Sequence, residues 1–285
     1  MFRSTDNDYF RLLRILLTGS LYPESFWQYV REPVPSEYSL FRPLRAMRAY
    51  AKKTFLTLAK KSGLALLRRE PVDLAARDAG RDWPFVGLTM AGLKRLENIA
   101  ECLERIAAER VPGDLVECGV WRGGAAIYMK AVADHVGLTD RDLWLADSFE
   151  GLPVPTLEED RLDPGHDLSM IGQLKVSADG VRSHFEHLGL WDERVKILRG
   201  WFKDTLPRAP IGSIALLRLD GDLYESTRDA LEALYRKVSH GGFVIVDDYY
   251  GWSSCKKAVD DFRRSHGITS AIVDIDWTGV YWKVD

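Results

Sequence analysis

The sequence predicts a doubly wound α/β domain, with a mostly parallel sheet covered by helices, preceded by a helical N-terminal extension. From Asp82 onward, short apolar runs alternate with stretches of helical periodicity, which is the pattern of a covered parallel sheet. The chain of 285 residues is 46% hydrophobic and 28% charged, so it is too apolar for a disordered protein. Residues 1–80 hold 14 Lys and Arg against 8 Asp and Glu, whereas residues 81–285 carry a net charge of −9. We therefore divide the chain into a basic extension, residues 1–80, and an acidic α/β domain, residues 81–285.

The basic extension is predicted to contain an amphipathic helix. Between Glu37 and Glu70 there are nine Lys and Arg and no acidic residue. Apolar residues recur there at spacings of three and four, which places them on one helix face: Leu44, Met47, Ala51, Phe55 and Leu58. The simplest interpretation is that this face packs on its own domain while the cations are solvated. The alternatives are docking on an acidic partner or peripheral contact of residues 42–69 with an anionic membrane. Nucleic acid is not an expected partner, because the acidic domain would repel its phosphates.

The elements of the acidic domain follow from its apolar runs and turn residues. Five strands are predicted, with two closing strands after them: residues 114–118, 143–146, 195–198, 214–219, 243–246, 271–275 and 279–283. Helices are predicted between them: residues 90–110, 124–136, 181–187, 226–238 and 255–266. The polar stretch 153–170 is rich in Pro and Gly, so we expect a long loop there.

Acidic residues stand at or just beyond the ends of several predicted strands, at Glu117, Asp147, Asp220, Asp247 and Asp248. The carboxyl ends of parallel strands meet at one edge of the sheet, where ligands bind. Asp220, Asp247 and Asp248 would converge there, and three carboxylates without a cation repel one another. A divalent ion such as Mg²⁺ is the economical explanation. The alternative is that one or two of these acids cap helices or pair with Arg218 or Lys256.

A glycine-containing turn follows the first predicted strand. Gly119 and Gly123 would allow a ligand to approach the backbone closely. The dinucleotide pattern G-x-G-x-x-G is interrupted by Trp121, and a P-loop lysine is missing, which disfavours a nicotinamide oxidoreductase and a triphosphate site. Glu117, two residues before the first glycine, suits a ligand with a cationic end. Asp147 stands where such folds bind a ribose, although it could equally be a cap or loop residue. S-adenosylmethionine combines an adenosine with a positive charge.

Asp222 is a candidate general base. It follows Asp220 by two residues, and Gly221 between them permits a tight turn. The Asp222 carboxylate could then face the same cleft without binding the ion, which is a suitable position for accepting a proton. The alternative is an acid at the start of a helix, stabilised by the helix dipole.

The expected location is the cytoplasm. The three cysteines form no CxxC pair, which argues against a disulfide framework or a thiolate zinc site. Charged residues interrupt the N-terminal apolar stretch that a signal peptide would need. The apolar runs are also far shorter than the ~18–20 residues that span a bilayer.

Five segments resemble the macrocin O-methyltransferase (TylF) family: VPGDLVECGVWRGGAAI (111–127), ADSFEGLP (146–153), GWFKDTLP (200–207), LDGDLYEST (219–227) and GGFVIVDDY (241–249). The resemblance implies a class I methyltransferase that uses S-adenosylmethionine and Mg²⁺, with a Rossmann-like sheet of seven strands whose last strand is antiparallel. It implies bacterial secondary metabolism, including antibiotic biosynthesis, with a sugar or glycoside hydroxyl as methyl acceptor. It also suggests a homo-oligomer. Residues 1–80 do not match the pattern, so the resemblance leaves the acceptor's identity open.

The resemblance also implies roles for individual residues. The cofactor would be bound by Thr89, Met90, Glu117, Gly119, Trp121, Gly123, Gly124, Asp147, Ser148, Trp201 and Asp204. The metal would be held by Asp220, Asp247 and Asp248, with Asp222 as the base. A competing hypothesis is a non-catalytic protein that binds a nucleotide or glycan as a partner in a biosynthetic complex. Retention of all these acids argues against it, because unused buried charge is costly.

Overall fold

The computed structural model describes residues 7–21, 26–29, 43–62, 67–70, 72–84, 86–163, 165 and 167–285. The chain forms two compact units. The larger unit comprises Met1–Leu21 and Ala75–Asp285, and the smaller unit comprises Tyr22–Leu74. The predicted extension of residues 1–80 is therefore divided between the two units, because its first helix belongs to the larger one.

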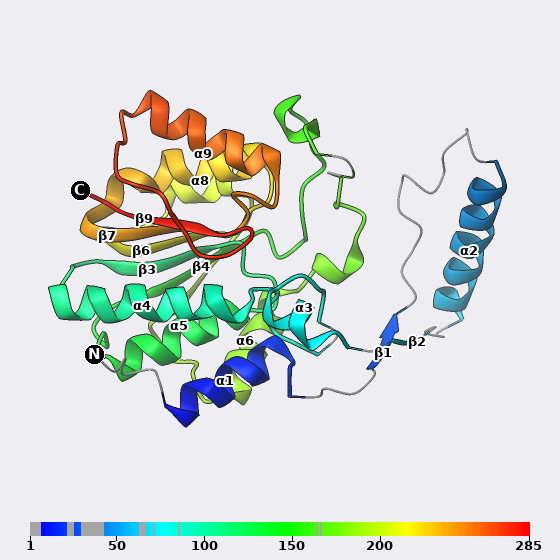
Figure 1. Ribbon diagram of the computed structural model, residues 1–285, viewed down its shortest axis with the longest axis horizontal. Coiled ribbons are helices and arrows are strands. Elements are labelled where there is room, and N and C mark those ends of the chain that lie inside the picture. The colour runs from blue at the N-terminus through cyan, green and yellow to red at the C-terminus, as the bar shows by residue number, and fades with distance from the viewer. Residues whose placement is uncertain are drawn as a thin grey trace. The chain divides into compact units, whose positions relative to one another are not determined.

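A seven-stranded sheet forms the centre of the larger unit (Figure 1). In spatial order its strands are β5 (Val195–Arg199), β4 (Leu143–Asp147), β3 (Asp114–Cys118), β6 (Ile214–Leu219), β7 (Val238–Val246), β9 (Val280–Lys283) and β8 (Val273–Asp274). The first five strands are parallel, β9 is antiparallel to β7, and β8 is antiparallel to β9. The predicted doubly wound α/β class and the antiparallel last strand are confirmed.

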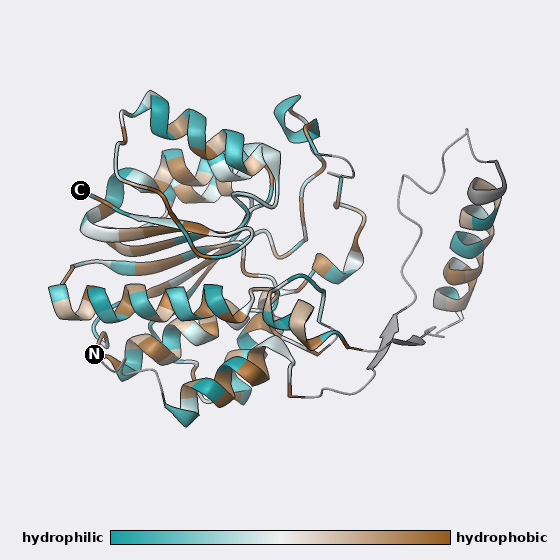
Figure 2. Ribbon diagram, in the orientation of Figure 1, coloured by the Kyte–Doolittle hydropathy of each residue, from teal (hydrophilic) through white to brown (hydrophobic). Residues whose placement is uncertain are grey.

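Helices cover both faces of this sheet (Figure 1). On one face lie α1 (Asp8–Thr18), α4 (Leu93–Glu109), α5 (Gly124–His135) and α6 (Ala178–His187), and on the other lie α8 (Tyr224–Leu234) and α9 (Ser253–Ser265). The shorter helices are α3 (Leu74–Asp78), α7 (Phe202–Thr205), η2 (Glu159–Arg161), η3 (Gly172–Leu174), η4 (Leu206–Arg208) and η5 (Tyr235–Lys237). Apolar residues concentrate on the strands and on the inner sides of the helices (Figure 2), and they form one buried cluster on each face.

Helix α1 joins the larger unit because its apolar residues are spaced for one buried face. Phe10, Leu13 and Leu17 are all buried in the cluster that contains α4 and α5. Full burial of such side chains contributes about 1.5–3 kcal/mol each. The side chain of Asn7 caps the helix by accepting from the Phe10 backbone N–H at 3.1 Å, and Gly19 ends it with φ +75°.

The smaller unit contains α2 (Pro43–Lys61) and an antiparallel pair, β1 (Phe26–Tyr29) and β2 (Leu67–Glu70). Helix α2 confirms the predicted basic helix. Within this unit, Met47, Phe55 and Leu58 on its predicted apolar face are 68%, 60% and 59% exposed. In the part of the chain that the structure describes, no helix combines the length and apolarity needed to cross a membrane.

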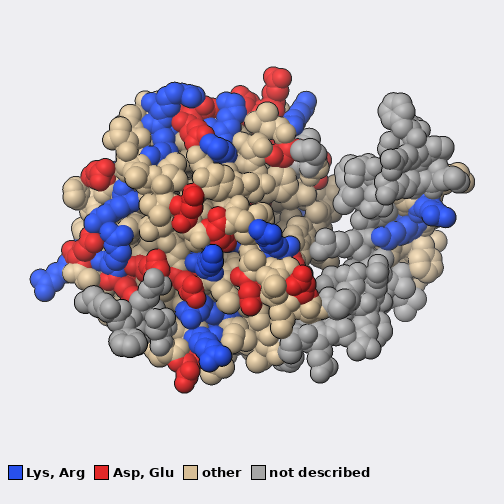
Figure 3. Space-filling model, viewed as in Figure 1, with Lys and Arg blue, Asp and Glu red and all other residues tan. Residues whose placement is uncertain are grey.

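The charges of the larger unit are interspersed on the face shown in Figure 3, where Lys and Arg lie among Asp and Glu. The negative balance of residues 81–285 therefore does not produce a uniformly acidic surface in this view. Part of that negative charge lies instead at the carboxyl edge of the sheet, on buried or half-buried acids.

Candidate functional site

The site lies at the point where the strand order reverses, between β3 and β6. Strands β4 and β5 extend from one side of β3, while β6 and β7 extend from the other. The ends of these two strands lie close together, since the Asp220 N–H donates to the Cys118 carbonyl at 2.8 Å. Gly119 has φ +90°, and a Cβ on it would lie 1.8 Å from the Asp220 carbonyl oxygen. This turn therefore requires glycine, and it opens at the edge where doubly wound folds bind ligands.

Two cavities open at this edge of the sheet. The first, of about 110 Å³, is called the turn cavity and is lined by residues that include Gly119, Trp121, Asp147, Ser148 and Trp201. The second, of about 260 Å³, is called the carboxylate cavity and is lined by residues that include Glu117, Asp220, Asp222, Asp247 and Asp248. Both contain Met90, Trp121, Asp220 and Asp222, so the two cavities adjoin.

Most of the predicted cofactor residues line these cavities. Gly119, Asp147, Ser148 and Trp201 line the turn cavity, Thr89 and Glu117 line the carboxylate cavity, and Met90 and Trp121 line both. The structure places three predicted residues elsewhere. A Cβ on Gly123 would lie 2.9 Å from Val181, and one on Gly124 would lie 2.5 Å from the Leu88 backbone, so both glycines serve close packing of α5. Asp204 is exposed on α7.

Asp147 ties the end of β4 to the turn after β3. Its Oδ2 accepts from the backbone N–H groups of Val120 at 2.7 Å and Trp121 at 3.4 Å, and its Oδ1 accepts from Phe149 N–H at 2.7 Å. Burial raises the pKa of Asp147 although these hydrogen bonds oppose the rise. The Ser148 hydroxyl also donates to Oδ1 at 3.4 Å. Of the about four acceptor positions of a carboxylate, two therefore carry short bonds and two carry long bonds that a ligand hydroxyl would have to replace.

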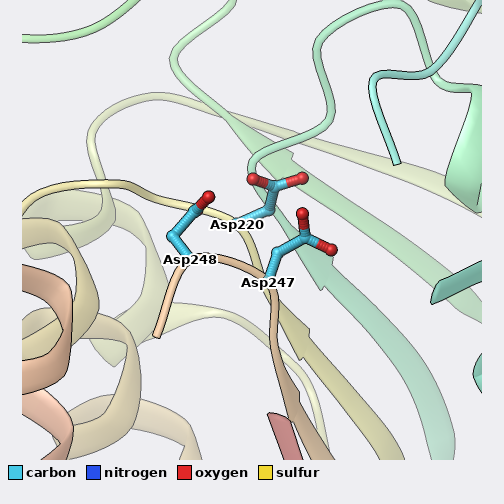
Figure 4. A group of neighbouring side chains, drawn as sticks. All are labelled: Asp220, Asp247 and Asp248. Carbon is cyan, nitrogen blue, oxygen red and sulfur yellow. The ribbon is translucent and has the colours of Figure 1, made fainter. Parts of the chain in front are cut away.

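Three carboxylates converge at the ends of β6 and β7 (Figure 4). One oxygen each from Asp220, Asp247 and Asp248 lies within 4.8 Å of the others. Burial, together with repulsion from Asp222, Asp220 and Asp247, raises the pKa of Asp248 well above its ordinary value, and its Oδ2 is buried without a hydrogen-bond partner. Burial and Asp247 also raise the pKa of Asp220. Crowded carboxylates with a spare buried oxygen fit a cation that prefers oxygen ligands.

Two buried arginines hold Asp247. Arg218 Nη2 lies 2.5 Å from Asp247 Oδ1 and 2.9 Å from Asp220 Oδ2, while Arg95 Nη1 donates to Asp247 Oδ2. Burial would raise the pKa of Asp247, but the two guanidinium groups lower it. Asp220 and Asp247 therefore pair with Arg218, as the alternative interpretation predicted, and they also converge with Asp248. Lys256 instead contacts Asp260 and Tyr249.

Glu117 contacts a protein cation. Its Oε1 accepts from Arg218 Nη1 at 2.5 Å, and its Oε2 is buried without a hydrogen-bond partner. Burial raises the pKa of Glu117 to about 8, although Arg218 opposes the rise. Glu117 thus orients Arg218, which in turn orients Asp220 and Asp247.

Asp222 lies between the two cavities in a strained conformation. Its φ of +56° is uncommon for a residue other than glycine. Burial, then repulsion from Asp220 and Asp247, raises the pKa of Asp222 to about 7, while a hydrogen bond with Trp252 opposes the rise. Helix α8 begins at Tyr224 with Leu223 as its N-cap, so Asp222 precedes the helix. A carboxylate with this proton affinity suits general-base chemistry.

Several residues of the site had no clear signal in the sequence. Arg95 appears in the sequence as one more polar residue of an amphipathic helix, and the cavity-lining tryptophans show no common spacing: Trp83, Trp252 and Trp277. Arg218 had a usable signal, since it is the one charged residue of the otherwise apolar strand β6.

A family model described as macrocin-O-methyltransferase (TylF) matches residues 6–284, so the match includes the basic N-terminal region. One relative is the 8-demethyl-8-(2,3-dimethoxy-α-L-rhamnosyl)-tetracenomycin-C 4′-O-methyltransferase of Streptomyces olivaceus. It is 49% identical over 244 residues, which cover 82% of this chain and 93% of the relative. The demethyldecarbamoylnovobiocin O-methyltransferase of Streptomyces niveus is 50% identical, over 73% of this chain and 79% of its own. The mycinamicin III 3″-O-methyltransferase of Micromonospora griseorubida is 44% identical, over 73% and 83% respectively.

Solved structures show the same fold. The O-methyltransferase NovP superposes with a TM-score of 0.78 at 41% identity, covering 97% of this chain and 98% of NovP. The calicheamicin methyltransferase CalS11 superposes with a TM-score of 0.56 at 19% identity, covering 90% of this chain and 95% of CalS11, which shows the shared fold alone. The chain belongs to the macrocin O-methyltransferase (TylF) family and is an S-adenosylmethionine-dependent O-methyltransferase.

Proposed function

We propose that this enzyme transfers the methyl group of S-adenosylmethionine to a sugar hydroxyl of a glycosylated natural product, with a divalent cation such as Mg²⁺ at the acidic cluster. The observation that carries the proposal is the position of Asp222, which lines both the turn cavity and the cavity that contains Asp220, Asp247 and Asp248. The relatives support the acceptor class, since one of them is named for a rhamnosyl tetracenomycin.

The turn cavity is the proposed cofactor site. Gly119 leaves room beside the turn, and Trp121 and Trp201 offer apolar surface. A ribose hydroxyl would bind Asp147 by replacing one of its two 3.4 Å hydrogen bonds, from Trp121 and Ser148. The acids of the adjoining carboxylate cavity favour a sulfonium at the junction, since its positive charge is attracted to them.

Asp220 and Asp248 are the proposed principal cation ligands. Both oxygens of Asp247 already accept hydrogen bonds from arginines, so Asp247 would be a weaker ligand of the cation. Its role would be to help position Asp220 and Asp248. A divalent cation at this cluster would act as a Lewis acid that lowers the pKa of an acceptor hydroxyl.

Asp222 is the proposed general base. From its position between the cavities, its carboxylate removes the proton of the acceptor hydroxyl as the oxygen attacks the methyl carbon. The sulfur leaves with the electron pair of its bond to that carbon. A positioned base contributes about 10²–10⁴ to the rate. The walls of the two cavities add a further rate enhancement by holding the acceptor oxygen and the methyl carbon within ~3–3.5 Å of each other.

An acceptor screen tests the proposal. The enzyme is incubated with S-adenosylmethionine, Mg²⁺ and each glycoside named for the relatives: the rhamnosyl tetracenomycin, demethyldecarbamoylnovobiocin and mycinamicin III. The corresponding aglycones serve as controls. We expect at least one glycoside to gain one methyl group on its sugar, as read by fragmentation mass spectrometry. Methylation of the aglycones alone, or of no compound, would contradict the proposal.

A further inference from the structure

The carboxylate cavity has an aromatic wall that the chemistry of methyl transfer does not use. Trp277, in the turn between β8 and β9, lines this cavity and is 43% exposed. Its indole Nε1 donates to the Ala79 carbonyl at 2.7 Å, which fixes the orientation of the ring. Tryptophan is enriched at binding interfaces, because its N–H can bind a polar group while its ring offers apolar surface.

Arg81 stands beside this ring. Its guanidinium carbon lies 5.1 Å from the Trp277 ring centroid, within the range of a cation–π contact, and it also lines the carboxylate cavity. Arg81 is exposed, and it forms no ion pair with any residue in the part of the chain that the structure describes. Its N–H donors therefore remain available to oxygens in the cavity.

The segment that carries Arg81 is held rigidly. Arg77 Nε donates to both oxygens of Asp82, at 2.8 and 2.7 Å, and Arg95 Nη2 donates to the Gly80 carbonyl at 3.2 Å. The same Arg95 side chain holds Asp247. The aromatic wall and the acidic cluster thus share a buried support, so their separation is fixed before a ligand binds.

We propose that Trp277 and Arg81 form the acceptor-sugar subsite of the enzyme. The indole face packs against the C–H face of the sugar ring, and the guanidinium donates to its hydroxyl or glycosidic oxygens. This inference rests on the proposed function, because it assigns the carboxylate cavity to the sugar that is methylated. A deoxysugar such as rhamnose presents the apolar face that this wall fits.

Steady-state kinetics with the glycoside that the unmodified enzyme methylates fastest test the subsite. We expect Trp277→Ala to raise the acceptor KM by ~10-fold or more, with kcat changed less than about 3-fold. Trp277→Phe should restore most of the affinity, and Arg81→Met should raise KM by a smaller factor. The affinity for S-adenosylhomocysteine should stay constant in all three. The matched control is Tyr9→Ala, which removes an aromatic side chain that is 58% exposed on α1 and lines neither cavity.

Ligand-observed NMR separates this inference from the proposed function. Saturation transfer from the enzyme to the ring protons of methyl α-L-rhamnopyranoside should occur with the unmodified enzyme and be lost in Trp277→Ala. An unchanged KM and unchanged saturation transfer in Trp277→Ala would overturn the subsite while leaving methyl transfer intact. Saturation transfer that depends on Trp277, in an enzyme that methylates no glycoside, would instead overturn the proposed function and leave Trp277 as a sugar-binding residue. If Trp277→Ala does not fold, an unchanged KM in Arg81→Met is the contradicting result.

Discussion

Arg218 Nη1 lies 2.5 Å from Oε1 of Glu117, and both side chains are only 1% exposed. The other terminal nitrogen of Arg218 reaches Asp220 and Asp247. One buried guanidinium therefore connects the turn after β3 to the acidic cluster at the ends of β6 and β7. The position of the cofactor turn and the position of the carboxylates are set by the same side chain.

Removal of Arg218 should destabilise the enzyme strongly. In Arg218→Met, Glu117 and Asp247 lose a partner while they remain buried, and breaking such a pair costs about 3–5 kcal/mol. We expect the free energy of unfolding in urea to fall by about this amount. The control is Arg228→Met, which breaks a partly exposed pair with Asp229 and should cost about 0–1 kcal/mol. Equal losses in the two variants would refute a special role for Arg218.

Mg²⁺ should stabilise the folded enzyme through the acidic cluster. A cation that binds only the native state at 100 times its Kd adds about 2.7 kcal/mol, which appears as a rise in Tm. Asp248→Asn should lose this rise, because it removes a charge and a ligand oxygen. Asp140→Asn, which alters an acid that is 84% exposed outside the cluster, should keep it. A rise that persists in Asp248→Asn would place the cation elsewhere.

Asp222→Asn should separate binding from turnover. The amide keeps the size of the side chain but cannot take a proton, so we expect kcat to fall about 10²- to 10⁴-fold. The affinity for S-adenosylhomocysteine and the Mg²⁺-dependent rise in Tm should stay close to those of the unmodified enzyme. Glu225→Gln, in the first turn of α8, is the matched control. An unaltered kcat in Asp222→Asn would mean that the base lies elsewhere.

Asp147→Ala should weaken cofactor binding in two ways. The substitution removes an acceptor from the turn cavity and also leaves the N–H groups of Val120 and Phe149 without their partner. We expect the Kd for S-adenosylhomocysteine, measured by calorimetry, to rise ~10-fold or more, which is about 1.4 kcal/mol. Asp142→Ala, just before the opposite end of β4, should leave the Kd unchanged. Similar effects of the two variants would argue against the turn cavity as the cofactor site.

The three cysteines should be unreactive in the folded enzyme. Cys102, Cys118 and Cys255 are all buried, and burial raises the pKa of each thiol, so little thiolate forms. Ellman's reagent should release no colour from the native protein and should report three thiols after unfolding in guanidinium chloride. Rapid modification of one native thiol would reveal an accessible cysteine.

The sequence predicted the sheet well because its five parallel strands are mostly apolar and end at or just before an acid or a glycine. The convergence of Asp220, Asp247 and Asp248 followed from strand-end positions alone. Helix α1 was assigned to the basic extension, since overall charge concealed the buried spacing of Phe10, Leu13 and Leu17.

The remaining features depend on contacts between distant parts of the chain. Arg95 and Asp247 are 152 residues apart, and Trp277 and Ala79 are 198 apart, so no local pattern reports either contact. Gly123 and Gly124 pack closely against Val181 and the Leu88 backbone, which the glycine-rich motif did not indicate, and their contact with the cofactor stays a prediction. The sequence could predict which acids stand at the ends of strands. The partners of the buried charges could be identified only from the folded structure.

The central claim is that the acidic cluster supports methyl transfer to a sugar. The most direct test is turnover of the three glycosides by enzyme treated with a chelator, before and after addition of Mg²⁺, with the methylated position read by mass spectrometry. The account predicts one methyl group on the sugar of at least one glycoside, lost after chelation and restored by Mg²⁺. Sugar methylation at an unchanged rate in the metal-free enzyme would contradict it.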